Sequence, residues 1–227
     1  YEILRCLVGS EMCIRDRAMG LNDVRITTRY EGTDFKKSIS STIHEAGHAM
    51  YDLQCDQSFS ITPLEGGSSL ALHESQSRFW ENIVGRSLPF VQLIAPLIRK
   101  QVSFANHSTD DELYLYFNNV KADYIRVDAD EVTYNLHIAL RYEIEKKIFG
   151  DELSISEIPE FWNDKMEHLL GVRPTRDSLG ALQDTHWSSG LFGYFPTYTL
   201  GNLVSAIIAS KMRKDLEDYE EAVSYTH

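Results

Sequence analysis

The sequence is short of cysteine, of basic residues and of long apolar runs. Its 3 cysteines in 227 residues are too few for the disulfide framework of a small secreted domain. Lys and Arg number 22 against 34 Asp and Glu, which gives a net charge of −12. Because phosphate binding needs a surplus of basic residues, this balance argues against a nucleic-acid partner. No apolar run approaches the roughly 18–20 residues of a membrane-spanning helix, so we expect no membrane association.

The two ends of the chain differ from its middle. Residues 1–17 show no clear hydrophobic period and hold two of the 3 cysteines, and they lack the apolar stretch and cleavage site of a signal peptide. This segment and residues 223–227 resemble out-of-frame translations of sequencing-adaptor DNA. We therefore expect both to be non-native and residues 18–222 to form the domain proper. Only Cys55 then remains, which favours a reducing, cytoplasmic setting.

Hydrophobic patterning predicts a mainly α fold with a short β-strand element before the first helix. Residues 24–30 are β-branched and aromatic, which is typical of a strand. The first helix is predicted over residues 39–54, with Ser38 or Ser40 as its N-cap. Further helices are predicted over residues 69–85, 89–104, 161–170 and 199–219, and in two pieces over 111–149. Loops are predicted over residues 58–69 and 180–195.

A His-Glu-X-X-His motif, made by His44, Glu45 and His48, lies inside the first predicted helix. A spacing of four residues places both imidazoles on one helix face, one turn apart, where both can reach a single ion. Glu45 lies beside them, where its carboxylate can take a proton from water on the metal. Gly47 costs a helix interior about 1 kcal/mol relative to alanine. We therefore expect another segment to approach the helix backbone there.

A hydrolytic zinc site needs a third protein ligand and one open position. The metzincin pattern is excluded, because it requires Gly and His where this chain has Tyr51 and Gln54. Two later carboxylates remain: Glu65, in a loop rich in glycine, and Glu74, near the start of the next helix. Because a helix holds a ligand more rigidly than a loop, we choose Glu74. Its neighbour His73 cannot share that helix face, so we expect it to pack beside the ligands or support them.

Arg78 and Glu81 follow Glu74 at spacings that place all three side chains on one helix face. Opposite charges in this arrangement are explained by an ion-paired face at least as well as by catalysis. We therefore assign neither residue a role in the reaction.

The motifs of the chain, taken in order, resemble those of the carboxypeptidase Taq family, which are zinc metallocarboxypeptidases. The matching positions are Asp23, Arg25 and Thr27; His44, Glu45 and His48; His73, Glu74 and Ser75; Ala129, Asp130 and Glu131; and Gly180, Gln183, Asp184, His186 and Trp187. The resemblance covers residues 22 to about 222. The family's preceding His-Pro-Phe motif is missing here, and family members are roughly twice as long. We therefore expect residues 18–222 to be a partial catalytic domain.

The resemblance implies metal ligands at His44, His48 and Glu74, with Glu45 as the general base. It implies Zn²⁺ as the cofactor, with Co²⁺ among the other divalent ions that such a site can take. It also implies release of single residues from peptides that carry a free C-terminal carboxylate. Family members are usually cytoplasmic homodimers with a mostly helical active-site groove.

A carboxypeptidase must recognise the free α-carboxylate of its substrate, which calls for a cation or backbone donors. Arg126 is our first candidate, because with Asp130, Thr133 and His137 it forms a polar stripe at helical spacing. The alternative interpretation is a buried Arg126–Asp130 ion pair that orders helices. Arg25 is the second candidate.

The oxyanion that develops during hydrolysis needs a donor besides the metal. His186 is a candidate, as are Tyr194 and Tyr198, although each tyrosine is equally consistent with a packed residue whose hydroxyl is satisfied. Two other functions stay open. One is an aminopeptidase or endopeptidase with the same ligand types, and the other is a metal-binding fragment without catalytic activity.

Overall fold

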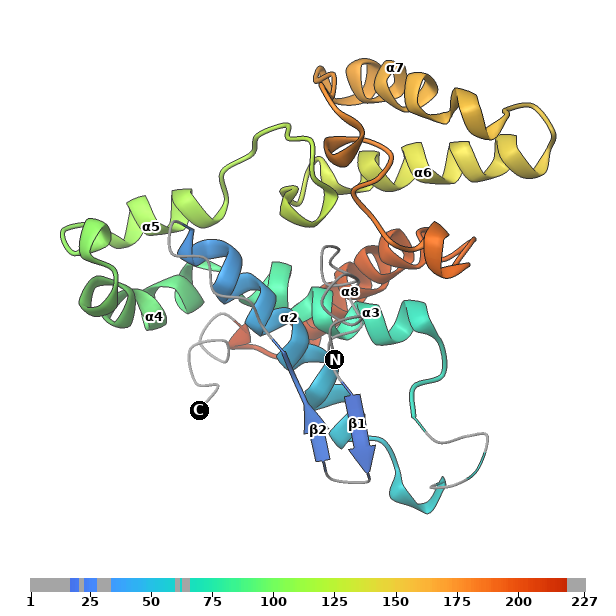
Figure 1. Cartoon of the computed structure of the whole chain (residues 1–227). Helices are drawn as coiled ribbons and strands as arrows, with labels where there is room; N and C mark the ends of the chain where they lie inside the picture. The colour runs from blue at the N-terminus through green and yellow to red at the C-terminus, as the bar shows by residue number, and fades with distance from the viewer. Residues whose placement is uncertain (1–16, 21–22, 28–33, 60–61, 63–65, 220–227) are drawn as a thin grey trace. The chain divides into compact units, whose positions relative to one another are not determined.

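The computed structural model describes residues 17–20, 23–27, 34–59, 62 and 66–219. Within these ranges the chain is mainly helical, with a two-stranded antiparallel sheet before the first helix (Figure 1). Strand β1 (Arg17–Gly20) pairs with β2 (Asp23–Arg25), and Arg17 lies opposite Arg25. The predicted fold class is therefore confirmed. The predicted strand over 24–30 overlaps β2, and its residues 28–30 lie outside the described ranges, as do 1–16 and 220–227.

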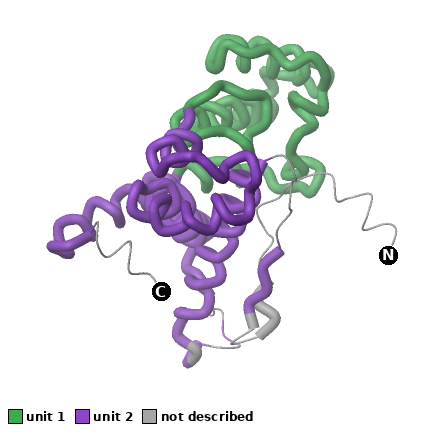
Figure 2. Tube along the Cα trace, turned by 90° about the vertical axis from the view of Figure 1, so that its left-hand side faces the viewer, with its two compact units in different colours: residues 1–14, 120–199 green, residues 15–119, 200–227 purple. Residues whose placement is uncertain are grey.

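The chain divides into two compact units (Figure 2). Unit 1 comprises residues 120–199, and unit 2 comprises residues 17–119 and 200–219 in the described part of the chain. The longer helices are α2 (Phe35–Leu53), α3 (Leu70–Arg78), α4 (Leu88–Gln101), α5 (Asp110–Phe117), α6 (Tyr134–Phe149), α7 (Ile158–Leu170) and α8 (Pro196–Asp215). A π-helical segment, Phe79–Val84, follows α3 directly. Short 3₁₀ turns are Gln57–Phe59, Ser103–Ala105, Arg126–Asp128, Ile155–Glu157, Asp177–Leu179 and Trp187–Ser189.

Helix α2 begins four residues earlier than the sequence pattern predicts. Its N-cap is Asp34, whose side chain accepts a hydrogen bond from the Lys37 backbone N–H. The predicted caps Ser38 and Ser40 both lie inside the helix, so that prediction is wrong. An acidic cap also interacts favourably with the positive end of the helix dipole. Phe35 packs against the apolar cluster of α4 and α5, so the extra turn carries a partly buried side chain.

The predicted polar stripe requires one continuous helix from Arg126 to His137, but residues 129–133 are not helical. Arg126 lies in the 3₁₀ turn Arg126–Asp128, and α6 begins only at Tyr134. The predicted stripe is therefore wrong. The physical reason lies in Asp130, which accepts hydrogen bonds from the backbone N–H groups of Val132 and Thr133. A short acidic side chain that binds its own following backbone favours a turn over a helix.

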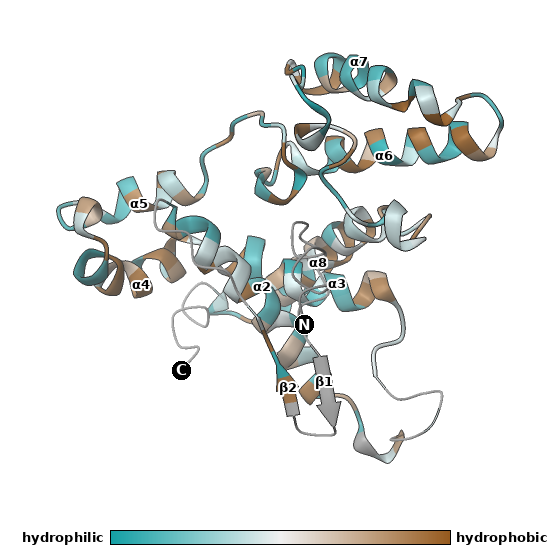
Figure 3. Ribbon diagram, viewed as in Figure 1, coloured by the Kyte–Doolittle hydropathy of each residue, from teal (hydrophilic) through white to brown (hydrophobic). Residues whose placement is uncertain are grey.

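Each unit has its own apolar core. In unit 1, α6 and α7 pack around a buried cluster consisting of Leu140, Ile144, Ile158, Trp162 and Met166. In unit 2, α4 and α5 bury Val91, Ala95, Ile98, Ala105, Leu113 and Phe117. Hydrophobic and hydrophilic residues alternate along these helices, as expected for helices with one buried face (Figure 3). Among the helices that the structure describes, none is long and apolar enough to cross a membrane.

Candidate metal centre

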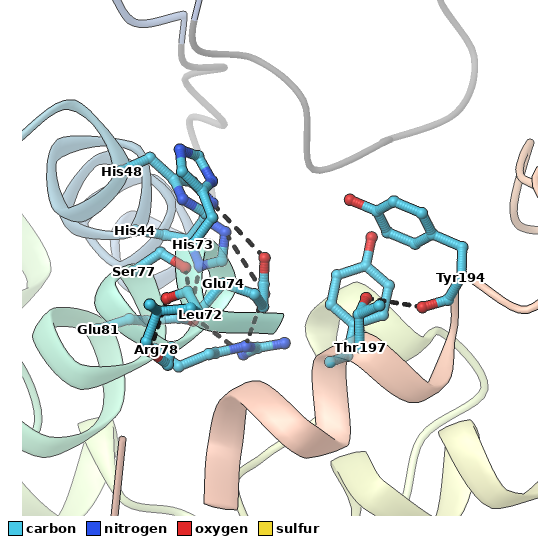
Figure 4. A network of polar contacts seen from close by, with 12 residues as sticks. His44, His48, Leu72, His73, Glu74, Ser77, Arg78, Glu81, Tyr194 and Thr197 are labelled. Carbon is cyan, nitrogen blue, oxygen red and sulfur yellow. Dashed lines mark hydrogen bonds and ion pairs between the residues drawn. The ribbon is translucent and has the colours of Figure 1, made fainter. Parts of the chain in front are cut away.

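Unit 2 brings together the side chains that the sequence predicts to bind a metal (Figure 4). Helix α2 presents His44 and His48, and α3 presents Glu74 toward them. The Nε2 atom of His44 lies 3.9 Å from Oε1 of Glu74, and that of His48 lies 3.5 Å from Oε2. One potential ligand atom from each residue lies within 4.8 Å of the others, and all three residues are buried.

This arrangement fits a divalent cation. Tetrahedral zinc binds N and O ligands at about 2.0–2.1 Å, which puts neighbouring ligand atoms about 3.4 Å apart. The His48–Glu74 separation of 3.5 Å is close to that value. His48 is also buried, and neither of its ring nitrogens forms a hydrogen bond with a described residue. Since a buried polar atom without a partner costs about 1–3 kcal/mol, a cation at this position would relieve that cost.

The charge state of these ligands also suits a metal, because carboxylate and imidazole ligands must be deprotonated. Burial raises the pKa of Glu74, but nearby His44, His48 and Arg78 lower it by more, so the net shift is downward. Burial is the main cause that lowers the pKa of His48. Both shifts favour the forms that can coordinate a cation near neutral pH.

Two glycines allow neighbouring helices to pack tightly around the centre. A Cβ on Gly47 of α2 would lie 2.7 Å from the Ser77 Cα, so the backbones of α2 and α3 meet there. This confirms the prediction that another segment approaches Gly47. A Cβ on Gly201 of α8 would lie 2.9 Å from Cγ of Glu74. A side chain at Gly47 would require the backbone of α3 to shift, and one at Gly201 would require the Glu74 side chain to move.

Further side chains contact the three ligands. The His73 ring stacks on the His48 ring, with centroids 4.3 Å apart and an interplanar angle of 13°. Nε2 of His73 lies 3.1 Å from Oδ1 of Asp52. His73 therefore packs beside a ligand, as one of the two sequence interpretations expects.

Glu81 contacts the ligand His44, which the sequence pattern did not predict. Its Oε2 atom lies 2.9 Å from Nδ1 of His44, and Arg78 bridges Glu74 and Glu81. Burial raises the pKa of Glu81, but Arg78 and His44 lower it by more, so its pKa falls from 4.5 to about 2. The shared helix face was visible in the sequence, but its contact with α2 depends on how the helices pack.

Glu45 and Arg25 are the other predicted residues of unit 2 that lie within the described ranges. Glu45 is buried on α2 between the two histidines. Arg25 is exposed at the end of β2, and its binding of a substrate carboxylate stays a prediction. The rejected candidate ligand Glu65 lies outside the described residues.

In unit 1, Arg126 pairs with a different carboxylate from the one predicted. Its Nη2 donates to Oδ1 of Asp184 at 2.7 Å, and its Nη1 donates to the Tyr134 hydroxyl at 2.7 Å. Arg141 donates to the other oxygen of Asp184 at 2.7 Å. Arg126 is completely buried, and its binding of a peptide carboxylate stays a prediction. The predicted Arg126–Asp130 pair is replaced by a pair with Asp184, a partner that sequence spacing could not reveal.

The other side chains of the 180–187 motif also point into unit 1. Gln183 accepts a hydrogen bond from the Arg126 backbone N–H at 2.8 Å, and the indole N–H of Trp187 donates to Glu145 at 2.7 Å. His186 Nε2 lies 3.0 Å from the hydroxyl of Tyr198, and both residues are buried. The Tyr194 ring centroid lies 5.3 Å from that of His186. The suggested oxyanion role of these residues stays a prediction.

Because His137 is buried in unit 1, we expect the free energy of unfolding to fall at acid pH. Burial, followed by Arg141 and Arg126, lowers its pKa from 6.5 to about 3. Between these values the unfolded chain binds a proton that the folded chain does not, so stability falls as pH falls. The slope for one such group is at most about 1.4 kcal/mol per pH unit. We expect His137→Gln to reduce the loss of unfolding free energy between pH 6.5 and 5, measured by denaturant titration.

His168 provides a matched control, because it is exposed on α7 of the same unit. The His168→Gln variant is expected to keep the wild-type pH slope. Equal slopes for wild type and His137→Gln would show that His137 is not the group responsible.

A mainly helical fold that carries a His-Glu-X-X-His helix and a buried carboxylate from the next helix is typical of a metallopeptidase. Among metallopeptidases, the family model of carboxypeptidase Taq (M32) matches residues 16–227 of this chain. The chain therefore belongs to the carboxypeptidase Taq family of metallopeptidases.

Named relatives and a solved structure agree with this assignment. Thermostable carboxypeptidase 1 of Pyrococcus furiosus is 54% identical over 205 residues, which span 90% of this chain and 41% of the relative. Carboxypeptidase 1 of Bacillus subtilis is 44% identical, over 87% of this chain and 40% of the relative. A solved Pyrococcus furiosus carboxypeptidase matches with a TM-score of 0.88 and 53% identity, over 92% of this chain and 42% of the other. The chain thus spans about two fifths of the length of these relatives.

Proposed function

We propose that this chain carries the catalytic centre of a zinc-dependent metallocarboxypeptidase that releases C-terminal residues from peptides. The observation that supports a metal is the buried set of His44, His48 and Glu74, with ligand atoms within 4.8 Å of one another. What supports a carboxypeptidase reaction is family membership and the names of the relatives. Zinc is proposed because two imidazoles and one carboxylate form a ligand set of its catalytic sites.

The proposed mechanism assigns one task to each side chain. His44, His48 and Glu74 would hold the ion. When bound, zinc lowers the pKa of its water ligand to about 7 and polarises the scissile carbonyl. Glu45, buried on the same helix as the histidines, would accept a proton from the attacking water and pass it to the departing amine.

Two groups of residues are proposed to bind the substrate. Arg126, or Arg25 at the exposed end of β2, is proposed to bind the α-carboxylate. One of His186, Tyr194 and Tyr198 is proposed to donate to the developing oxyanion. The proposed partners are peptides with a free C-terminal carboxylate, and the proposed assembly is a cytoplasmic homodimer.

A second candidate is a metal-binding piece without turnover. It is favoured by the fact that this chain spans 41% of a relative at 54% identity. The remaining length of such a relative could supply side chains that the reaction needs.

The test is hydrolysis of an N-blocked dipeptide by the whole chain, first freed of metal and then loaded with zinc. We expect release of the C-terminal amino acid only after loading, and loss of release when a chelator is added. An aminopeptidase would not cleave this substrate, because it needs a free amine. Bound zinc at one ion per chain without hydrolysis would contradict the proposal and support the inert piece.

A further inference from the structure

The two ring nitrogens of His44 face two different carboxylates. Nδ1 lies 2.9 Å from Oε2 of Glu81, and Nε2 lies 3.9 Å from Oε1 of Glu74. An ionised carboxylate can only accept a hydrogen bond, so the short contact requires that Nδ1 carry the proton. The lone pair of a neutral His44 then resides on Nε2, on the side of Glu74 and His48.

Arg78 links the two carboxylates. Its Nε donates to Oε1 of Glu74 at 3.2 Å, and its Nη1 donates to Oε2 of Glu81 at 3.1 Å. The guanidinium is planar and rigid, so the two contacts fix the carboxylates relative to each other. All three side chains are largely buried, with Glu81 the most exposed at 13%. Solvent therefore weakens these contacts far less than it would on the surface.

The backbone that carries Glu81 is unusual. Helix α3 ends at Arg78, and Glu81 lies in the π-helical segment Phe79–Val84. The Gly85 N–H donates to the Trp80 carbonyl at 2.7 Å, which is the five-residue bond of a π-helix. Such segments are rare and frequently occur at functional sites. Here the segment carries the carboxylate that reaches back to a ligand on α2.

We propose that Glu81 is a positioning residue for the metal: it holds the Nδ1–H form of His44, while Arg78 couples it to the ligand Glu74. This inference rests on the metal site of the proposed function. Carboxylates that accept the second N–H of a ligating histidine set its ring orientation and raise its basicity. Removing such a partner lowers metal affinity by about 10–100-fold in other metalloproteins.

The first test measures zinc affinity by competition with a chromophoric chelator, at a temperature where circular dichroism shows every variant folded. We expect Glu81→Gln to bind zinc about 10–100-fold more weakly than wild type. The control is Glu143→Gln, because Glu143 pairs with Lys165 at the surface of unit 1. It is expected to bind zinc like the wild type. A purely structural role of Glu81 would lower the melting temperature and leave the zinc affinity of the folded chain unchanged, which would overturn the inference.

The second test needs no variant at Glu81 and so is independent of whether that variant folds. A long-range ¹H–¹⁵N correlation spectrum of the zinc-loaded wild type reports which imidazole nitrogens carry protons, with His44 assigned from a His44→Gln sample. We expect Nδ1 of His44 to be protonated and Nε2 to be bound to zinc. Protonation at Nε2 would refute the inference but not the proposed function. Failure of the wild type to bind zinc would refute both.

Discussion

The Glu45→Gln variant is expected to hydrolyse the N-blocked dipeptide about 10²–10⁴-fold more slowly than wild type, which is the usual contribution of a general base. Glutamine preserves the size of the side chain but cannot accept the water proton. Because Glu45 is not one of the three ligands, zinc should stay bound. The measurement is kcat/KM for the zinc-loaded chain, with the zinc content of each sample determined alongside.

The Glu143→Gln variant again serves as the matched control, since it makes the same chemical change at a partly exposed surface position. It should hydrolyse the dipeptide at the wild-type rate. If Glu45→Gln retains full zinc and shows the wild-type rate, Glu45 is not the base.

The Asp184→Asn variant should produce the largest loss of folding stability. Asp184 is the carboxylate that pairs with both Arg126 and Arg141, and both arginines are fully buried. Burial raises the pKa of Asp184, but the two arginines lower it well below its usual range, so it is ionised in the folded chain. Removing one partner of a buried ion pair costs about 3–5 kcal/mol, because the remaining charge is left buried. We expect at least this loss in the unfolding free energy, measured by denaturant titration.

The same substitution at Asp164 provides the comparison. Asp164 pairs with Arg173 at 2.7 Å, but both side chains are well exposed. Solvent-exposed pairs contribute little to stability, so Asp164→Asn should cause a much smaller loss. Similar losses for the two variants would mean that the Asp184 pairs contribute no more than a surface contact.

Features with a strong local signal could be predicted from the sequence. The four-residue spacing of His44 and His48 fixes their shared helix face, and Gly47 marks the close approach of Ser77. The helix predicted over residues 161–170 ends where α7 ends, and the residue that follows, Gly171, has a φ of +70°. The histidine spacing and the helix end depend only on residues a few positions apart, so the pattern alone was sufficient. Gly47 indicates that a segment approaches the helix, but not which segment.

Features that depend on tertiary packing could not be predicted. Arg126 and Asp184 lie 58 residues apart in sequence, and periodicity does not report on such a contact. The local pattern instead suggested Asp130 as the partner of Arg126. In the structure Asp130 accepts hydrogen bonds from the backbone N–H groups of Val132 and Thr133. The contact between Glu81 and His44 could not be predicted for the same reason. The helix face of Glu81 was predicted, but the contact depends on how this face packs against α2.

The metal centre is tested most directly by titrating the metal-free chain with zinc in an isothermal calorimeter, which gives the number of ions bound per chain and their affinity. The wild type is predicted to bind one zinc ion per chain. Glu74→Gln, which keeps the side-chain size but removes the ligand charge, is predicted to lose stoichiometric binding. A wild-type chain that binds no zinc, or a Glu74→Gln variant that binds it as tightly, would contradict the metal centre on which the proposed function depends.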